Sequence, residues 1–301
     1  MRILLVYPEF PDTFWSFKHA LRFVSKRASL PPLGLLTVAS MLPHGWEKRL
    51  VDMNVRALTQ KDLEWADYVL VSAMVVQRHS AQQVLARCRR AGVKVIAGGP
   101  LFTAEAEKFP EVDHLILNEA ERTLPVFLRD LSQGCQQRVY TSGEFADVRL
   151  TPAPLWELLD LRRYAAMCIQ YSRGCPFNCE FCNVTTLFGH KPRVKSAQQL
   201  VDELDGLHAL GWRGNVFFVD DNLIGNKRHL REEILPALKA WGARARGISF
   251  QTEVSINLAD DEELTRQLVE VGFDTVFVGI ETPNEESLSE CSKVQNKGRD
   301  L

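Results

Sequence analysis

The chain has 301 residues, of which 46% are hydrophobic and 25% are charged, and its formal net charge is −2. This composition is typical of globular proteins, and the length allows two domains of ordinary size. The near-neutral charge gives no basis for a nucleic-acid-binding surface, and no apolar run is long enough to predict a transmembrane segment. The N-terminal residues MRILLVYPEF predict a buried strand and not a signal peptide, so we expect a cytoplasmic protein.

The first half of the sequence alternates apolar, strand-like runs with helical patterns. The expected strands are at 2–8, 47–53, 68–76, 93–99 and 114–119, and the expected helices are at 33–42, 60–66, 80–91, 102–109 and 123–133. Nearly continuous apolar strands separated by helices predict a parallel sheet that is covered on both faces. We therefore expect a doubly wound, flavodoxin-like α/β domain at 1–135, with ligands bound at the carboxyl ends of its strands.

Several residues at these strand ends are candidates for contacts with a ligand. They are Pro8, Glu9, Asp52, Met53, Asn54, Ser72, Ala73, Met74, Gly98, Gly99, Pro100, Asn118 and Glu119. The double glycine leaves the backbone open to a ligand, but it fits an ordinary tight turn equally well. A dinucleotide site is disfavoured because the G-x-G-x-x-G pattern is absent. The aromatic residues Phe14, Trp15 and Phe17, after the first strand, are expected to form loop core, and the alternative is a lid over a cofactor.

Between residues 136 and 165 the periodic pattern breaks. The sequence TPAP at 151–154 favours extended backbone, which predicts a linker laid over a surface. Past this linker, the basic stretch from Lys191 to Lys195 is expected to be a solvated face.

The second half, 166–301, has a βα rhythm. Strands are expected at 166–174, 215–221, 248–254 and 275–281, and helices at 196–210, 228–241 and 261–271. This rhythm predicts a parallel barrel with its active site at the carboxyl ends of the strands. Only about four βα units fit, whereas an eight-unit barrel needs about 250 residues, so we expect a partial barrel. The expected strand ends carry Arg173, Asp220, Asp221, Asn222, Thr252, Glu253, Glu281 and Thr282.

Three of the seven cysteines, Cys175, Cys179 and Cys182, form a C-x3-C-x2-C motif after the first of these strands. Three thiolates can hold three irons of a four-iron cluster and leave the fourth iron open to another ligand. A structural zinc site needs a fourth protein ligand, and His190 makes a Cys3His zinc site the alternative. The scattered cysteines are expected to have no special role: Cys88, Cys135, Cys168 and Cys291.

With Phe181 before its last cysteine, the motif resembles the radical S-adenosylmethionine (SAM) signature C-x3-C-x-aromatic-C. The segments PEFPDTFWSF, PPLGLL, LVDMN, DDNLIGNKR and GIETPNEESL resemble the subgroup in which a flavodoxin-like domain binds cobalamin, including the hopanoid methylases. The resemblance covers nearly the whole chain. It implies three cofactors: a 4Fe-4S cluster on the three cysteines, SAM on the open iron, and cobalamin in the first domain.

The resemblance also implies roles for residues around SAM. It puts Phe181 near the adenine, where the structural alternative is a core aromatic. It puts Asp220 or Asp221 opposite the amino group, where the alternative is a helix-capping pair. Because adjacent strand residues point in opposite directions, one acid of the two is expected to face the site. Glu253 and Glu281 would face the ribose or methionine end, against a solvated or structural role.

In the first domain, the resemblance puts Ser72, Ala73 and Met74 beneath the corrin ring and the cofactor tail past Gly98 and Gly99. The remaining cobalamin candidates are the strand-end residues Asn118 and Glu119. The D-x-H-x-x-G motif that supplies a cobalt-ligating histidine elsewhere is absent, so we expect no histidine ligand from this motif.

The leading hypothesis is a cobalamin-dependent radical SAM methyltransferase acting on an unactivated carbon of a small-molecule or lipid substrate. The alternatives are a radical rearrangement or cyclisation without methyl transfer, and a non-catalytic cobalamin-binding fragment. A methylthiotransferase is disfavoured because that class carries three further cluster cysteines in its N-terminal domain, where this chain has only Cys88 and Cys135. The expected partners are the substrate and an electron donor such as flavodoxin or ferredoxin, with membrane association if the substrate is a lipid. No catalytic residue is predicted.

Overall fold

The computed structural model describes residues 1–13 and 16–299, which form two compact units. The first unit comprises Met1–Ala146 and Leu150–Ala165, and the second comprises Asp147–Arg149 and Ala166–Leu301. Both units are α/β structures with a parallel sheet, which confirms the predicted fold class. No helix within the described ranges is both long and apolar enough to cross a lipid bilayer.

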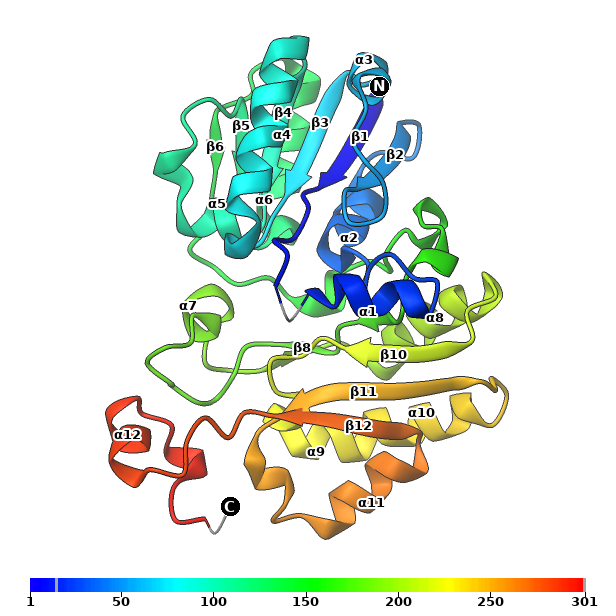
Figure 1. Ribbon diagram of the computed structural model, residues 1–301, viewed down its shortest axis with the longest axis vertical. Coiled ribbons are helices and arrows are strands. Elements are labelled where there is room, and N and C mark those ends of the chain that lie inside the picture. The colour runs from blue at the N-terminus through cyan, green and yellow to red at the C-terminus, as the bar shows by residue number, and fades with distance from the viewer. Residues whose placement is uncertain (14–15, 300–301) are drawn as a thin grey trace. The chain divides into compact units, whose positions relative to one another are not determined.

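The first unit is built on a six-stranded sheet in the order β2-β1-β3-β4-β5-β6 (Figure 1). Its strands are β1 (Arg2–Tyr7), β2 (Glu47–Asp52), β3 (Tyr68–Ser72), β4 (Lys94–Gly98), β5 (His114–Ile116) and β6 (Val139–Tyr140). All neighbouring strands are parallel, and the order is the flavodoxin-like one, as predicted. The sequence pattern misses β6, because only two residues of a largely polar segment join the sheet.

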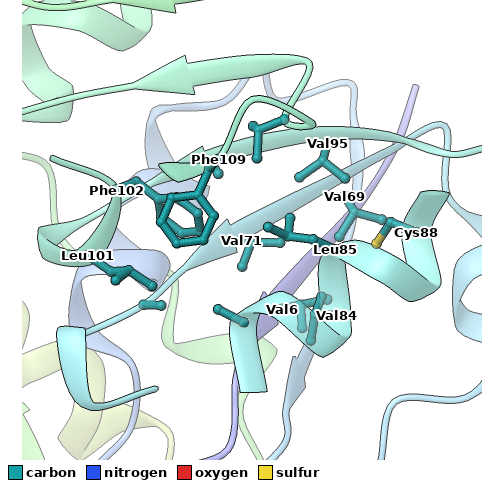
Figure 2. Close-up of a cluster of buried hydrophobic side chains, with 14 of the residues drawn as sticks. Val6, Val69, Val71, Val84, Leu85, Cys88, Val95, Leu101, Phe102 and Phe109 are labelled. Carbon is teal, nitrogen blue, oxygen red and sulfur yellow. The ribbon is translucent and has the colours of Figure 1, made fainter. Parts of the chain in front are cut away.

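Helices cover both faces of this sheet. They are α2 (Leu33–Met41), α3 (Gln60–Trp65), α4 (Arg78–Ala91), α5 (Pro100–Ala104) and α6 (Ala120–Gln133). A further short helix, α1 (Lys18–Phe23), follows β1 in the chain. Alternate strand residues face opposite sides: Leu4 and Val6 pack with α3, α4 and α5, whereas Ile3 and Leu5 pack with α2 and α6. Figure 2 shows the first of these cores, where Val84 on α4 lies close to the sheet.

The segment predicted as a linker contains β6 and the short 3-10 turns η4 (Val148–Leu150), η5 (Trp156–Leu158) and η6 (Leu161–Arg163). Much of it packs on the first unit: Leu155 N–H donates to the Leu36 carbonyl at 3.1 Å, and the Tyr164 hydroxyl donates to Asp52 at 3.1 Å. Of the aromatic group expected as loop core, Phe14 and Trp15 lie outside the described residues. Phe17 is 46% exposed, so the expectation is wrong for this residue.

The second unit has a four-stranded parallel sheet in the order β12-β11-β10-β7. Its strands are β7 (Met167–Ile169), β10 (Gly214–Phe218), β11 (Ile248–Val254) and β12 (Phe273–Val278). Neighbours in the sheet are successive in the chain, as in the predicted partial barrel. The single strand expected at 166–174 is wrong. It divides into β7 and β8 (Ser172–Arg173), which pairs with β9 (Arg193–Val194) in an antiparallel ribbon.

The helices of the second unit are α7 (Val184–Phe188), α8 (Ala197–Ala209), α9 (Lys227–His229), α10 (Leu235–Gly242), α11 (Glu262–Glu270) and α12 (Glu285–Glu290). A π turn, Leu230–Ile234, separates α9 from α10 where one continuous helix was expected. One face of the sheet is a core in which the rings of Phe218, Phe250 and Phe273 lie 5.2–5.4 Å apart. On β11, the residues that alternate with Phe250 face the other side of the sheet. This side is more accessible and includes Glu253.

Candidate functional site: a cysteine loop and two sheet edges

The cysteine motif lies on the loop between β8 and α7. The Cys182 N–H donates to the Cys179 carbonyl at 3.0 Å, and the Cys175 N–H donates to the Gly189 carbonyl at 3.2 Å. All three thiols are partly exposed. Burial raises the pKa of the Cys175 thiol, and the charges of Asp221 and of the other two cysteines raise it further. The three sulfurs and Asp221, at the carboxyl end of β10, therefore lie close enough for their charges to interact; we call this one electrostatic environment.

A glycine allows the cysteine loop to close on itself. Gly174 has a φ of +98°, and a Cβ there would lie 2.8 Å from the Gly189 carbonyl oxygen and 3.0 Å from those of Phe188 and Lys191. No side chain fits this approach, because the contacts are with backbone atoms that cannot move aside. Gly174 thus brings both arms of the loop together beside the β8–β9 ribbon.

The donor chemistry of this loop fits an iron–sulfur cluster. Within residues 1–13 and 16–299, no three His, Cys, Asp or Glu side chains already form a metal site. The loop nevertheless supplies three thiols from eight residues, which is the chemistry of cluster ligands. His190, the fourth ligand in the zinc alternative, has an exposed side chain.

The basic stretch next to this loop is not a solvated face throughout, which corrects the expectation. The Lys195 ammonium pairs with the Glu203 carboxylate of α8, and these side chains are only 5% and 1% exposed. The Lys195 N–H also donates to the Tyr171 carbonyl at 2.9 Å. Burial raises the pKa of Glu203, and the Lys195 charge lowers it in part. The pair therefore fastens the end of the ribbon to α8.

The two acids at the end of β10 have different surroundings. Asp220 is buried and accepts hydrogen bonds from the N–H groups of Tyr171 and Ser172 and, at 2.6 Å, from the Ser172 hydroxyl. Burial raises its pKa to about 7, against the lowering effect of these hydrogen bonds. Asp220 thus joins β10 to the start of the cysteine loop. Asp221 is half-buried, and burial raises its pKa to about 6. Of the two carboxylates, that of Asp221 is the one that does not take part in the junction between β10 and the cysteine loop.

Glu253 and Glu281 lie at the next two strand ends and have different partners. Partial burial raises the pKa of Glu253, and the neighbouring Asp221 carboxylate raises it further. Glu281 has a left-handed backbone, with a φ of +65°, and pairs with the Lys293 ammonium. The structure therefore groups Glu253 with Asp221 and the cysteines, whereas Glu281 belongs to an ion pair.

Phe181, between the second and third cysteines, is 60% exposed, which contradicts the core-aromatic alternative. The Lys293 ammonium lies 5.5 Å from the centroid of its ring. This distance is within the range of a cation–π contact. The exposed ring and the three thiols remain the elements of this loop that a bound cofactor could meet.

In the first unit, the predicted cobalamin residues of β3 and β4 lie side by side at the carboxyl edge of the sheet. A Cβ at Gly99, which has a φ of +90°, would lie 2.6 Å from the Ser72 hydroxyl, and one at Gly98 would lie 2.7 Å from the Ile116 carbonyl oxygen. Both glycines are thus required by the packing of the chain itself. They also leave a flat, side-chain-free backbone next to Ser72.

An apolar strip continues from the end of β3 into η2 (Val75–Gln77). Met74, Val75 and Val76 are 44%, 36% and 61% exposed. Three consecutive exposed apolar side chains at the carboxyl edge of a parallel sheet are unusual unless a ligand covers them. A largely apolar, planar corrin ring is the kind of group that this strip fits.

Asn118 and Glu119 have structural partners at the end of β5. Asn118, with a φ of +61°, donates its amide to the Thr141 hydroxyl at 3.0 Å and to the Ser142 carbonyl at 2.7 Å. The buried Glu119 carboxylate accepts the Ala146 N–H at 2.6 Å. These contacts hold the segment after β6 against the sheet edge.

Sequence reasoning misses Gln77, which is fully buried at this edge. Its amide donates to the Pro8 carbonyl at 2.6 Å and accepts the Met74 N–H at 2.7 Å. Gln77 thereby links the ends of β1 and β3 and holds Met74 in place. A glutamine placed directly at the end of the apolar run after β3 is the signal that could have identified it.

Comparisons with known proteins find a different family model in each half of the chain. A model of the radical SAM superfamily matches residues 169–300, and a model of the B12 binding domain matches residues 23–128. An uncharacterised methyltransferase of Synechocystis sp. is 47% identical over 100% of this chain and 56% of its own length. The hopanoid C-2 methylase of Rhodopseudomonas palustris is 37% identical over 98% of this chain and 57% of its own length. The chain thus spans little more than half the length of these relatives.

The fold also matches a solved structure. The cobalamin-dependent SAM radical enzyme OxsB, with aqua-cobalamin bound, superposes with a TM-score of 0.72 at 17% identity. The match covers 98% of this chain and 46% of that chain. The arrangement of a flavodoxin-like unit followed by a partial barrel therefore occurs in a known protein.

Proposed function

Because this chain is a radical SAM protein with an N-terminal B12-binding domain, we propose that it acts in a cobalamin-dependent methyltransferase on an unactivated carbon of a small-molecule or lipid substrate. The observation that carries this proposal is the loop of three thiols in one electrostatic environment with Asp221 at the end of β10. The methyltransferase and hopanoid-methylase names of its relatives support methyl transfer, and the second of them supports a polycyclic lipid as the first substrate to test. We further propose a cytoplasmic location and a flavodoxin- or ferredoxin-type electron donor.

When bound, the cluster with SAM would supply a hydrogen-abstracting radical, and cobalamin would supply the methyl group. The residues of the chain then have positioning roles. Cys175, Cys179 and Cys182 would hold the cluster, and Asp221 would accept hydrogen bonds from the SAM ammonium. The strip Met74–Val76 would cover the apolar face of the corrin.

The test is anaerobic reconstitution of the chain with iron and sulfide, followed by addition of hydroxocobalamin, methyl-labelled SAM, a reductant and a hopanoid in detergent micelles. We expect an iron–sulfur absorbance, release of 5′-deoxyadenosine, and a hopanoid product heavier by one labelled CH2 group. Release of 5′-deoxyadenosine with an unlabelled, rearranged product would indicate the non-methylating alternative. Cobalamin binding without a cluster would indicate a non-catalytic fragment.

We predict that Asp221→Asn weakens SAM binding to the reconstituted protein. A hydrogen bond between ionised partners is worth about 1.5–3 kcal/mol, so the Kd should rise roughly 10- to 150-fold. Binding can be followed by the change that SAM causes in the electron paramagnetic resonance spectrum of the reduced cluster. Asp202→Asn, at an exposed position of α8, is the matched control and should leave the Kd unchanged. An unchanged Kd in Asp221→Asn would remove Asp221 from the SAM site.

We predict that Met74→Asp weakens cobalamin binding. Burying a methionine side chain contributes about 1.5–3 kcal/mol, and a carboxylate in its place must also be desolvated, so the Kd should rise at least about 10-fold. Quenching of tryptophan fluorescence by hydroxocobalamin provides the measurement. Val24→Asp changes another exposed apolar residue of the first unit and should bind as the wild type does. Equal weakening in both variants would argue against a corrin site at Met74.

A further inference from the structure

The segment that follows α12 lies against the cysteine loop. Three contacts join them: the Glu180 N–H donates to the Cys291 carbonyl at 2.9 Å, the Gln295 Nε2 donates to the Cys179 Sγ at 3.4 Å, and the Lys293 ammonium faces the Phe181 ring. All are long-range in sequence, because more than a hundred residues separate Cys179 from Gln295. One of them reaches a sulfur atom that we assign to the cluster.

The same segment is fixed to the end of β12. The Lys293 side chain is 9% exposed and pairs with Glu281. Asn296, which is 1% exposed, donates its amide to the carbonyls of Gly279 and Ile280 at 2.9 and 2.8 Å. A Cβ at Gly279 would lie 2.9 Å from the Lys293 ammonium, so the glycine leaves room for this ion pair.

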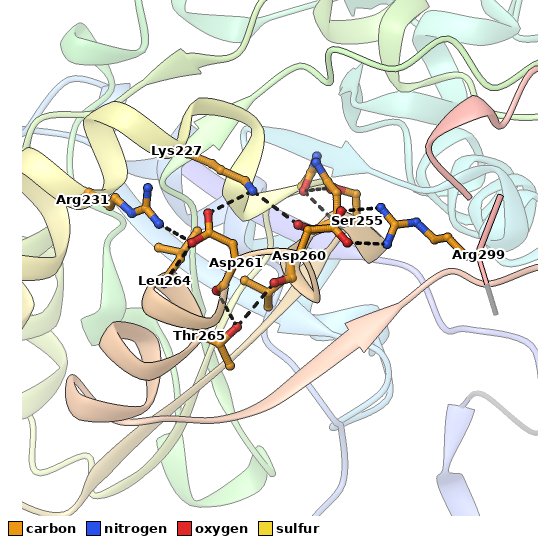
Figure 3. Close-up of polar contacts among 11 residues, drawn as sticks. Lys227, Arg231, Ser255, Asp260, Asp261, Leu264, Thr265 and Arg299 are labelled. Carbon is orange, nitrogen blue, oxygen red and sulfur yellow. Dashed lines mark hydrogen bonds and ion pairs between the residues drawn. The ribbon is translucent and has the colours of Figure 1, made fainter. Parts of the chain in front are cut away.

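An arginine holds the backbone of Gln295 from the other side. The Arg299 Nε donates to the Gln295 carbonyl at 3.0 Å, and its guanidinium forms two hydrogen bonds with the Asp260 carboxylate, one of 2.8 Å. Figure 3 shows this fork beside the contacts of Lys227 and Arg231 with Asp261. The Gln295 backbone is therefore held by Arg299, and the segment around it by Lys293 and Asn296. None of these contacts involves the three cysteines of the motif.

The buried position of the Gln295 side chain is not explained by a gain in folding stability. Its other amide atom, Oε1, is buried and has no hydrogen-bond partner in the described part of the chain. Such an unsatisfied group costs about 1–3 kcal/mol. Its position beside Cys179 points to a role of the N–H group toward the sulfur.

Resting on the proposed radical SAM function, we propose that Gln295 is a positioning residue whose amide N–H donates to the Cys179 thiolate, holding this ligand for cluster assembly and setting the cluster's reduction potential. A hydrogen bond to a ligand sulfur withdraws negative charge from it, so it favours the reduced cluster. Supporting contacts of this kind change metal affinity by about 10- to 100-fold when they are removed.

The experiment compares the wild-type chain with Gln295→Leu, which keeps the size of the side chain without its N–H. The matched control is Gln198→Leu, at an exposed glutamine of α8. Each protein is reconstituted anaerobically with iron and sulfide, and the loss of iron to a chelator and the midpoint potential are measured. For Gln295→Leu, we expect roughly 10-fold faster iron loss and a more negative potential. Gln198→Leu should match the wild type.

The outcomes separate this inference from the function on which it rests. If the wild type forms a cluster and Gln295→Leu equals it in potential and iron retention, the inference is wrong and the function stands. If the wild type forms no cluster, the proposed function itself fails, and the role of Gln295 fails with it. Should Gln295→Leu not fold, Gln295→Asn decides: its amide is one methylene too short to reach the sulfur, so a wild-type potential would overturn the inference.

Discussion

Replacing Cys179 by alanine should abolish the iron–sulfur cluster and the release of 5′-deoxyadenosine. The variant removes one of three thiols that the loop brings into one environment, and the loop has no other thiol to replace it. The loss of 5′-deoxyadenosine formation should exceed about 100-fold, because removal of a supporting contact alone can reach that magnitude. Iron and sulfide contents, the visible absorbance and chromatography of the products provide the measurements.

Cys291→Ala is the control for this prediction. Its carbonyl accepts the Glu180 N–H at 2.9 Å, so Cys291 is close to the loop, but its thiol donates to the Leu288 carbonyl at 3.7 Å. We therefore expect Cys291→Ala to keep its cluster and its activity. A cluster that survives in Cys179→Ala and disappears in Cys291→Ala would show that the ligand set is wrong. Zinc bound to the wild type with full protein coordination would contradict radical chemistry altogether.

The features that could be predicted from the sequence are those set by local pattern. The strands β1, β3, β4 and β5 contain apolar runs, and the pattern identifies them because these runs are buried on both faces. The edge strand β2 begins with charged, more exposed residues and is apolar only at Leu50 and Val51. The cysteine motif is equally local, since its three thiols lie within eight residues. The loop chemistry and the sheet order could therefore be anticipated before any contact was known.

The features that could not be predicted depend on distant partners. The two-residue strands β6, β8 and β9 exist only through their pairing. From the sequence alone, Asp220 and Asp221 are equal candidates for the SAM site. They are distinguished only by the N–H groups of Tyr171 and Ser172, which lie nearly fifty residues earlier and donate to Asp220. The role of Gln295 likewise requires that the end of the chain lie against a loop at Cys179.

The largest decrease that we expect in the free energy of unfolding comes from breaking the buried ion pair between Lys195 and Glu203. Lys195→Met leaves the Glu203 carboxylate buried without its partner, and breaking a buried pair in this way costs about 3–5 kcal/mol. The urea midpoint of the second unit, followed by circular dichroism, should fall accordingly. Arg266→Met, which breaks exposed pairs with Glu263 and Glu270, should leave the urea midpoint nearly unchanged.

A double variant and the pH dependence identify the unpaired charge as the cause. In Lys195→Met/Glu203→Leu no charge is left to desolvate, so most of the stability should return. Burial already raises the pKa of Glu203 above its unfolded value, and loss of the Lys195 charge, which lowers that pKa, should raise it further. The native state then binds more protons than the unfolded state, so its stability falls as pH rises toward the folded pKa. Lys195→Met should therefore be more destabilised at about pH 8 than at about pH 5. A pH-independent loss, not restored in the double variant, would mean that packing and not charge holds the ribbon to α8.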